Sequence, residues 1–153
     1  MKISDFLIPA CVTPDLKSSG KIDVLAELAE LFSSAHSEIS KEELTASLVE
    51  RERLATTGFG NGAAIPHAKS ASLQHIQGAF GISRTGIPFD STDGKPVNFF
   101  FALFAPQGAA NEHIMALGRI SQLLRNSNFR KEVLQAKTGQ EIFNIITKED
   151  RKG

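Results

Sequence analysis

The chain has 153 residues, enough for one domain with a single buried core, and we expect residues 1–153 to form that domain. Hydrophobic residues make up 41% and charged residues 22%, as in an ordinary globular protein, and 17 Lys and Arg balance 17 Asp and Glu. This balance carries no electrostatic sign of binding to nucleic acid or to an anionic membrane, so neither partner is expected.

The sequence contains no predicted membrane span. The longest apolar run, Val97 to Ala105, is interrupted by Asn98 and is too short to cross a bilayer. The N-terminal segment carries Asp5 early and leads into no signal-peptide core, which favours a cytoplasmic location. Cys11 is the only cysteine, so neither an internal disulfide nor a thiolate metal cluster can form, and we expect Cys11 to be buried beside a turn.

Two helices are predicted first. After a turn at residues 18–20, apolar residues recur at three- and four-residue steps from Lys21 to Ala35, which predicts a helix with one buried face. Ser40 followed by Glu43 is typical of a capping box and predicts the start of a second helix, which ends in a charged run at residues 50–53. The expected inward side chains are Ile22, Leu25, Leu28, Ala29 and Phe32 in the first helix and Leu44, Leu48 and Val49 in the second.

Two strands are predicted next. The segment from Ile76 to Arg84 alternates in part between apolar and other residues, and a turn follows around Gly86 and Pro88. The segment from Val97 to Phe104 is almost continuously apolar, which indicates a strand covered on both faces in the middle of a sheet.

Helices are predicted again at the C-terminal end. Asn111 is the expected N-cap of the first, with Glu112 in its first turn and an apolar stripe formed by His113, Leu117, Ile120 and Leu124. Shorter helical patterns follow around residues 129–136 and 140–146. The order of elements predicts an α/β sandwich with a single sheet, without fixing the strand order.

A glycine-rich stretch lies between the predicted helices and strands. Gly58, Gly60 and Gly62 do not have the spacing of the dinucleotide-binding fingerprint, and the Lys-Ser/Thr ending of a nucleotide-binding P-loop is absent. We therefore interpret these glycines as positions that allow a positive φ or a close approach of another backbone or of a partner surface.

His67 is the candidate nucleophile. Pro66 fixes its own φ and favours an extended Ile65, so the chain leading to His67 is stiff. A neutral imidazole has a free nitrogen lone pair near pH 7 and can accept a phosphoryl group from a phosphoamidate. On residue type alone, a surface or satisfied core histidine remains the alternative.

His113, Arg51 and Arg53 are further candidates. A neutral His113 near the start of a helix can donate a hydrogen bond to a phosphoryl oxygen, or it can simply lie at the edge of an amphipathic stripe. Arg51 or Arg53 can bind phosphate through a planar guanidinium, or both can belong to a solvated face, and only one is assigned a purpose. His36 and His75 have no supporting context and are expected at the surface.

Three segments together resemble a known family: Glu50 to Leu54, Thr57 to Lys69, and Asn111-Glu112-His113. They look like the fructose/mannitol type of enzyme IIA in the bacterial phosphoenolpyruvate:sugar phosphotransferase system. Nearly the whole chain is covered, and as a chain without fused transporter parts it is most similar to the nitrogen-regulatory enzyme IIA subgroup.

The resemblance implies a site. It makes His67 the residue phosphorylated on Nε2, His113 the second active-site histidine, which supports the phosphoryl group, and Arg51 the active-site arginine. It also implies a mixed sheet of about five strands between helical layers, and a phosphoryl donor that is HPr or an HPr-like phosphocarrier. Ala68 departs from the family pattern, where Gly is common after Pro-His.

Several functions are compatible with these residues. The first is a phosphotransferase component that works through a phosphohistidine, with a nitrogen-related regulatory role exerted through partner proteins and without a cofactor or metal. The second is a sugar-specific IIA subunit that passes the phosphoryl group to a cysteine of an enzyme IIB. A metal-binding hydrolase using His67, His113 and Glu112 and a scaffold without phosphotransfer are the remaining alternatives. Phe59 and Ile65 are expected to offer an apolar docking surface, although Phe59 also suits the core.

Overall fold

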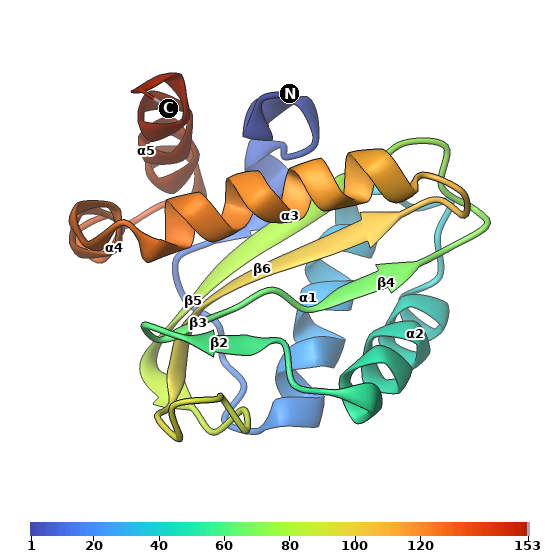
Figure 1. Ribbon diagram of the computed structural model, residues 1–153, viewed down its shortest axis with the longest axis horizontal. Coiled ribbons are helices and arrows are strands. Elements are labelled where there is room, and N and C mark those ends of the chain that lie inside the picture. Colours follow the sequence, from blue (N-terminus) through green and yellow to red (C-terminus); the bar gives the residue numbers. More distant parts are fainter. Residues whose placement is uncertain (153) are drawn as a thin grey trace.

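The computed structural model describes residues 1–152, in which six strands form one mixed sheet with helices against both faces (Figure 1). This confirms the predicted α/β sandwich. The elements are η1 (Ile3–Asp5), η2 (Pro9–Cys11), β1 (Val12–Thr13), α1 (Lys21–Ala35), α2 (Lys41–Leu54), β2 (Gly58–Gly60), β3 (Ala63–Ala64), β4 (His67–Lys69), β5 (Gln77–Ile87), β6 (Val97–Ala105), α3 (Ala110–Arg125), α4 (Ser127–Val133) and α5 (Gly139–Lys152).

The strand β6 lies in the middle of the sheet. It pairs antiparallel with β5 on one side and parallel with both β3 and β4 on the other. β1 joins β5 in parallel and β2 joins β3 antiparallel, which gives the order β1-β5-β6-β3-β2 with β4 also beside β6. All but one residue of β6 are buried, as predicted for a strand covered on both faces.

Phenylalanines of β6 alternate between the two faces of the sheet, because successive side chains of a strand point in opposite directions. The ring of Phe104 lies 4.5 Å from that of Phe32 in α1. The ring of Phe101 lies 5.8 Å from that of Phe80, which in turn is 6.4 Å from Phe129 in α4. The helices α1 and α2 therefore cover one face, and α3 lies across the other (Figure 1).

The two N-terminal helices begin and end as predicted, with one error in the buried face. Ile22 is 57% exposed, because no described element covers that side of the first turn of α1, and Val24 is buried instead. Ser40 caps α2 by accepting a hydrogen bond from the Glu43 amide at 3.1 Å. The Glu43 carboxylate does not complete a capping box, because it accepts from the Ser70 hydroxyl at 3.0 Å and so ties α2 to the segment after β4.

The predicted N-cap of α3 is wrong. Gly108 has a φ of +82°, which lets the chain turn earlier than expected, and Ala109 is the N-cap residue. The His113 amide donates to the Ala109 carbonyl at 2.9 Å, so Asn111 is already inside the helix. Glu112 lies in the first turn, as predicted, and α5 continues past the predicted end at residue 146.

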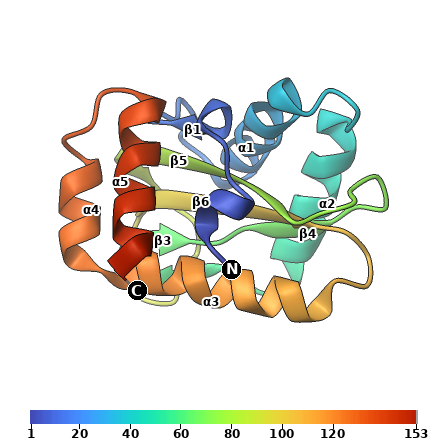
Figure 2. The same cartoon turned by 90° about the horizontal axis from the view of Figure 1, so that it is seen from above.

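The segment before α1 forms short elements that the sequence did not predict. The Ile3 amide donates to the buried Asp150 carboxylate of α5 at 2.6 Å, so the beginning of the chain lies beside its last helix (Figure 2). Cys11 is buried, as predicted, and His75 is exposed. His36 is not a surface residue: it is half-buried, with its ring stacked on Phe32 at 4.1 Å. Among the described residues, none of the helices combines the length and the apolar character that a membrane span requires.

Candidate active site

The glycine-rich stretch forms the turn that leads to His67. Gly60, Asn61 and Gly62 have φ values of +104°, +60° and +70°, which confirms that glycines here allow a positive φ. The turn brings β3 alongside β6, and the Pro66 carbonyl then accepts a hydrogen bond from the Leu103 amide at 2.9 Å. His67 is thus carried to the start of β4 by backbone held against the central strand.

His67 and His113 meet on the face of the sheet that α3 covers. His67 pairs in register with Leu103 of β6, and His113 lies near the beginning of α3. Their ring centroids are 5.2 Å apart and the ring planes are perpendicular, at 89°. The ends of α2, β4 and α3 that carry the candidate residues gather at the same end of the sheet (Figure 1).

Hydrogen bonds define which nitrogen of His67 is available. Nδ1 lies 2.9 Å from the Ile65 carbonyl oxygen, which can only accept, so Nδ1 carries the proton of the neutral ring. Nε2 lies 3.1 Å from Nε of Arg51, which can only donate, so Nε2 holds the lone pair. Both bonds select the same tautomer, with the nucleophilic lone pair on Nε2.

Arg51 and Arg53 have different surroundings although they are two residues apart on α2. Arg51 Nε donates to His67, and its Nη1 donates to the Ala55 carbonyl at 3.0 Å. Arg53 faces outward and pairs with Glu50 at 3.5 Å, with both side chains 72% exposed. The structure brings Arg51 to His67 and leaves Arg53 on a solvated face.

Both histidines of the site favour the neutral form. Burial lowers the pKa of His67 below its ordinary value of 6.5, and the nearby Arg51 guanidinium acts in the same direction, while the Ile65 carbonyl opposes the shift. Burial also lowers the pKa of His113, with the proximity of His67 as the next cause. The two rings are therefore suited to act as a neutral nucleophile and a neutral hydrogen-bond donor near pH 7.

His113 has an unused polar atom. It is 9% exposed, and its Nε2 is buried without a hydrogen-bond partner among the described residues. A buried polar atom of this kind costs free energy unless a partner arrives. An anionic oxygen bound between the two rings would supply such a partner.

A pocket of about 560 Å³ opens beside these side chains. It is lined by Arg51, His67, His113 and Lys69 together with apolar residues, of which Leu54 is 77% and Ile114 68% exposed. Large apolar side chains exposed around a pocket are typical of a surface that docks a partner. The sequence prediction missed both residues, and the only signal available was their position directly after Arg53 and His113.

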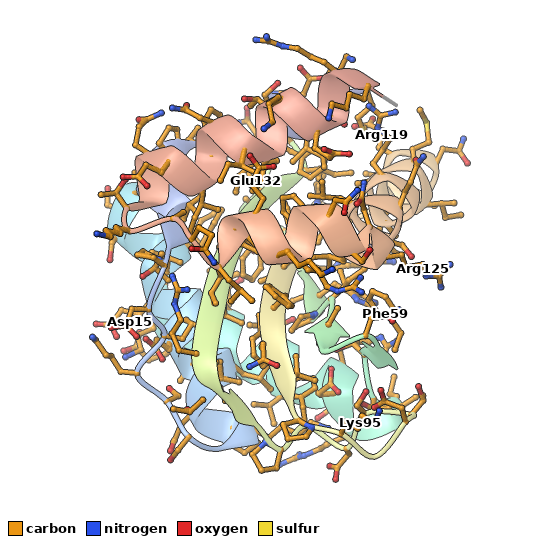
Figure 3. The ribbon with its side chains drawn as sticks, turned by 90° about the vertical axis from the view of Figure 1, so that its left-hand side faces the viewer. Asp15, Phe59, Lys95, Arg119, Arg125 and Glu132 are labelled. Carbon is orange, nitrogen blue, oxygen red and sulfur yellow. The ribbon has the colours of Figure 1, made fainter. Side chains whose placement is uncertain are left out.

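The predicted docking residues lie elsewhere. Ile65 is buried at 7% exposure. Phe59 packs partly against the core, and Arg125 lies over its ring at 5.5 Å from the centroid (Figure 3). Ala68 is buried in β4 and has no positive φ, so extended backbone accommodates alanine at this position. As for the hydrolase alternative, the described residues contain no group of three His, Cys, Asp or Glu side chains able to hold a metal ion.

Comparisons with known proteins identify the family of this chain. The profile of the family described as "Phosphoenolpyruvate-dependent sugar phosphotransferase system, EIIA 2" matches residues 5–149. A nitrogen regulatory protein of Bradyrhizobium diazoefficiens is 36% identical over 146 residues, which cover 95% of each chain. The fructose-specific EIIABC component of Bacillus subtilis is 34% identical over 151 residues, or 99% of this chain, which spans only 24% of that relative.

A solved structure has the same fold. The crystal structure of the nitrogen regulatory protein IIA-Ntr from Neisseria meningitidis superposes with a TM-score of 0.87 at 30% sequence identity. The superposition covers 95% of this chain and 99% of that one. With a family profile matched over nearly its whole length, this chain belongs to the EIIA 2 family of the phosphoenolpyruvate-dependent sugar phosphotransferase system.

Proposed function

We propose that His67 accepts a phosphoryl group on Nε2 from the phosphohistidine of an HPr-like carrier, with residues 1–153 acting as one unit. The observation that carries the proposal is the pair of hydrogen bonds that places the proton on Nδ1 and the lone pair on Nε2. A nucleophile held in this tautomer beside a guanidinium meets the two needs of phosphoryl transfer, position and charge stabilisation.

The proposed step exchanges one N–P bond for another. The lone pair of His67 Nε2 forms a bond to phosphorus as the bond to the donor histidine breaks, and that electron pair returns to the donor's ring nitrogen. The Nδ1 proton stays in place, and the Ile65 carbonyl stabilises the positive charge that develops on the ring. Arg51 needs only a small shift of its guanidinium from Nε2 to bind the oxygens of the phosphoryl group.

His113 is proposed to donate a hydrogen bond from Nε2 to the transferring group. We expect His113→Ala to accept the phosphoryl group about five- to tenfold more slowly, because a neutral hydrogen bond stabilises by roughly 1 kcal/mol. His113→Gln, which keeps a donor, should recover part of this loss. The measurement is the rate of phosphorylation, with Glu112→Gln as an exposed neighbouring control. Unchanged rates in both directions for His113→Ala would remove this role.

The expected donor is a small phosphocarrier that binds over the pocket. Leu54 and Ile114 present exposed apolar surface beside His67, and Lys69 supplies a positive charge at the same opening. Apolar contact with a few charges around it suits a transient complex between two proteins.

We further propose that the protein has a nitrogen-related regulatory role. The support is the match to a nitrogen regulatory protein over 95% of both chains. Phosphorylation would add up to about two negative charges at the opening of the pocket, which is enough to change the partners that bind there. The two forms of His67 would then select different regulatory targets.

The second candidate is a transport role, in which the phosphoryl group passes to a cysteine of an enzyme IIB. The support is the match to part of a fructose-specific EIIABC component. Mixing the phosphorylated protein with a fructose-type IIB separates the candidates: rapid loss of the phosphoryl group to the IIB cysteine supports transport, and its retention supports regulation.

The proposed function is tested by incubating the protein with phosphoenolpyruvate, enzyme I and an HPr-type carrier, then measuring its intact mass. The expected result is a gain of one phosphoryl group that depends on all three components. A protein that keeps its original mass while the carrier in the same mixture is phosphorylated would contradict the proposal.

A further inference from the structure

Glu52 is a buried charged residue directly beside the site. It follows Arg51 on α2 but lies with Leu44 and Leu48 among the buried residues of that helix, and its side chain is only 3% exposed. A carboxylate taken out of water costs several kcal/mol unless it is paired and hydrogen-bonded. Burying a carboxylate at this position is therefore unfavourable unless other groups bind it, and the contacts of Glu52 show which groups do.

The Glu52 carboxylate is hydrogen-bonded to Thr57, in the loop that follows α2. Oε2 accepts a hydrogen bond from the Thr57 amide at 2.9 Å, and Oε1 accepts from the Thr57 hydroxyl. Lys21 of α1 places Nζ 3.1 Å from Oε2 and 4.7 Å from the centroid of the Phe89 ring. These contacts fix Thr57 relative to both α1 and α2.

Two further hydrogen bonds connect Thr57 to His67 through Ile65. The Thr57 carbonyl accepts a hydrogen bond from the Ile65 amide at 3.2 Å, and the Ile65 carbonyl is the acceptor for His67 Nδ1 at 2.9 Å. On the other side, Arg51 binds both the Ala55 carbonyl and His67 Nε2. A closed ring of contacts therefore runs from α2 through Thr57 and Ile65 to His67 and returns through Arg51.

We propose that Glu52 is a positioning residue for phosphoryl transfer, which holds the Ile65 carbonyl and the Arg51 guanidinium on opposite sides of the His67 ring. This inference rests on the proposed function of His67. Without the carboxylate, the Thr57 loop is free to shift, the Ile65 acceptor moves with it, and His67 loses the contact that keeps its proton on Nδ1. The ring then samples the other tautomer, in which Nε2 has no lone pair to offer.

Glu52→Ala should disturb both the rate of phosphoryl transfer and the tautomer of His67. We expect a 10- to 100-fold slower acceptance of the phosphoryl group, about the cost of misplacing reacting groups by an ångström. We also expect the ¹⁵N spectrum of the unphosphorylated protein to show His67 in a mixture of tautomers, where the wild type has the proton on Nδ1. Glu52→Gln should recover most of both, because its amide oxygen can accept from Thr57 and its amide group can donate to the Thr57 hydroxyl.

A matched control separates positioning from stability. Asp150 is a similarly buried carboxylate, paired with Arg119 of α3 at 2.6 Å and hydrogen-bonded to the Ile3 amide. Asp150→Ala should lose thermal stability as Glu52→Ala does, yet keep the wild-type tautomer of His67 and the wild-type rate. Thr57→Val removes one donor without changing side-chain size and serves as the test variant should Glu52→Ala fail to fold.

A wild-type tautomer together with a wild-type rate in Glu52→Ala, or in Thr57→Val as its substitute, would overturn the proposal. So would an equal loss of rate in Asp150→Ala, because the effect would then follow stability alone. The tautomer is read in the free protein. It therefore tests the role of Glu52 even if the wild type accepts no phosphoryl group. That second outcome would contradict the proposed function of His67, not the positioning role of Glu52.

Discussion

His67→Ala should accept no phosphoryl group from an HPr-type carrier. His67 supplies the only nitrogen lone pair that the structure holds between a backbone acceptor and a guanidinium, among the residues it describes. His113 cannot replace it in this role, because its Nε2 has no hydrogen-bond partner and no arginine is hydrogen-bonded to its ring among the described contacts. The measurement is intact mass after incubation with phosphoenolpyruvate, enzyme I and the carrier.

Two other histidines provide the controls for this experiment. His75 is exposed and His36 is half-buried against Phe32, at positions that do not line the pocket. His75→Ala and His36→Ala should each gain one phosphoryl group as the wild type does. An equal gain by His67→Ala would show that the phosphoryl group is carried elsewhere.

Arg51→Ala should accept the phosphoryl group about 100- to 1,000-fold more slowly than the wild type. This is the typical loss when a preorganised donor to a developing negative charge is removed. Arg51→Lys should recover only part of the rate, because an ammonium is a point charge and cannot copy the planar fork of a guanidinium, whose Nε and Nη1 donate to two separate partners here. Single-turnover phosphorylation with a pre-phosphorylated carrier measures the rate.

Arg53 offers a control of the same residue type on the same helix. Its exposed pair with Glu50 contributes little, so Arg53→Ala should keep the wild-type rate of transfer. If Arg51→Ala transfers as fast as Arg53→Ala, the proposed charge stabilisation by Arg51 is wrong.

The long elements of this fold were predictable because their patterns are local. The three- and four-residue steps of α1 and the apolar run of β6 indicate a helix with one buried face and a central strand before any contact is known. By contrast, β2, β3 and β4 have two or three residues each and no measurable period. They exist because a distant strand, β6 or a neighbour already paired with it, supplies their hydrogen bonds.

The candidate site was predicted in its residues but not in its geometry. The family resemblance indicated His67, His113 and Arg51, and the structure brings these three side chains together. The tautomer of His67 depends on the Ile65 carbonyl, whose orientation follows from the turn at Gly60 to Gly62 and from pairing with β6. Sequence patterns carry no information about such an orientation.

Glu52 was not identified as a buried residue from the sequence. In the sequence it is one of four consecutive charges at residues 50–53, which favour a solvated helix end. Yet it follows Leu44 and Leu48 at steps of four, so all three side chains lie on the buried face of α2. The spacing was available in the sequence, but only the Thr57 and Lys21 contacts show why a carboxylate is stable there.

The central claim, that Nε2 of His67 takes the phosphoryl group, is tested most directly by ¹⁵N NMR of the phosphorylated wild-type protein. Correlation spectra of ring nitrogens and carbon-bound protons distinguish phosphorylation at Nε2 from phosphorylation at Nδ1. We expect the phosphorus on Nε2 of His67, with the proton retained on Nδ1 and bonded to the Ile65 carbonyl. A phosphoryl group on Nδ1 of His67, or on any other residue, would contradict this account.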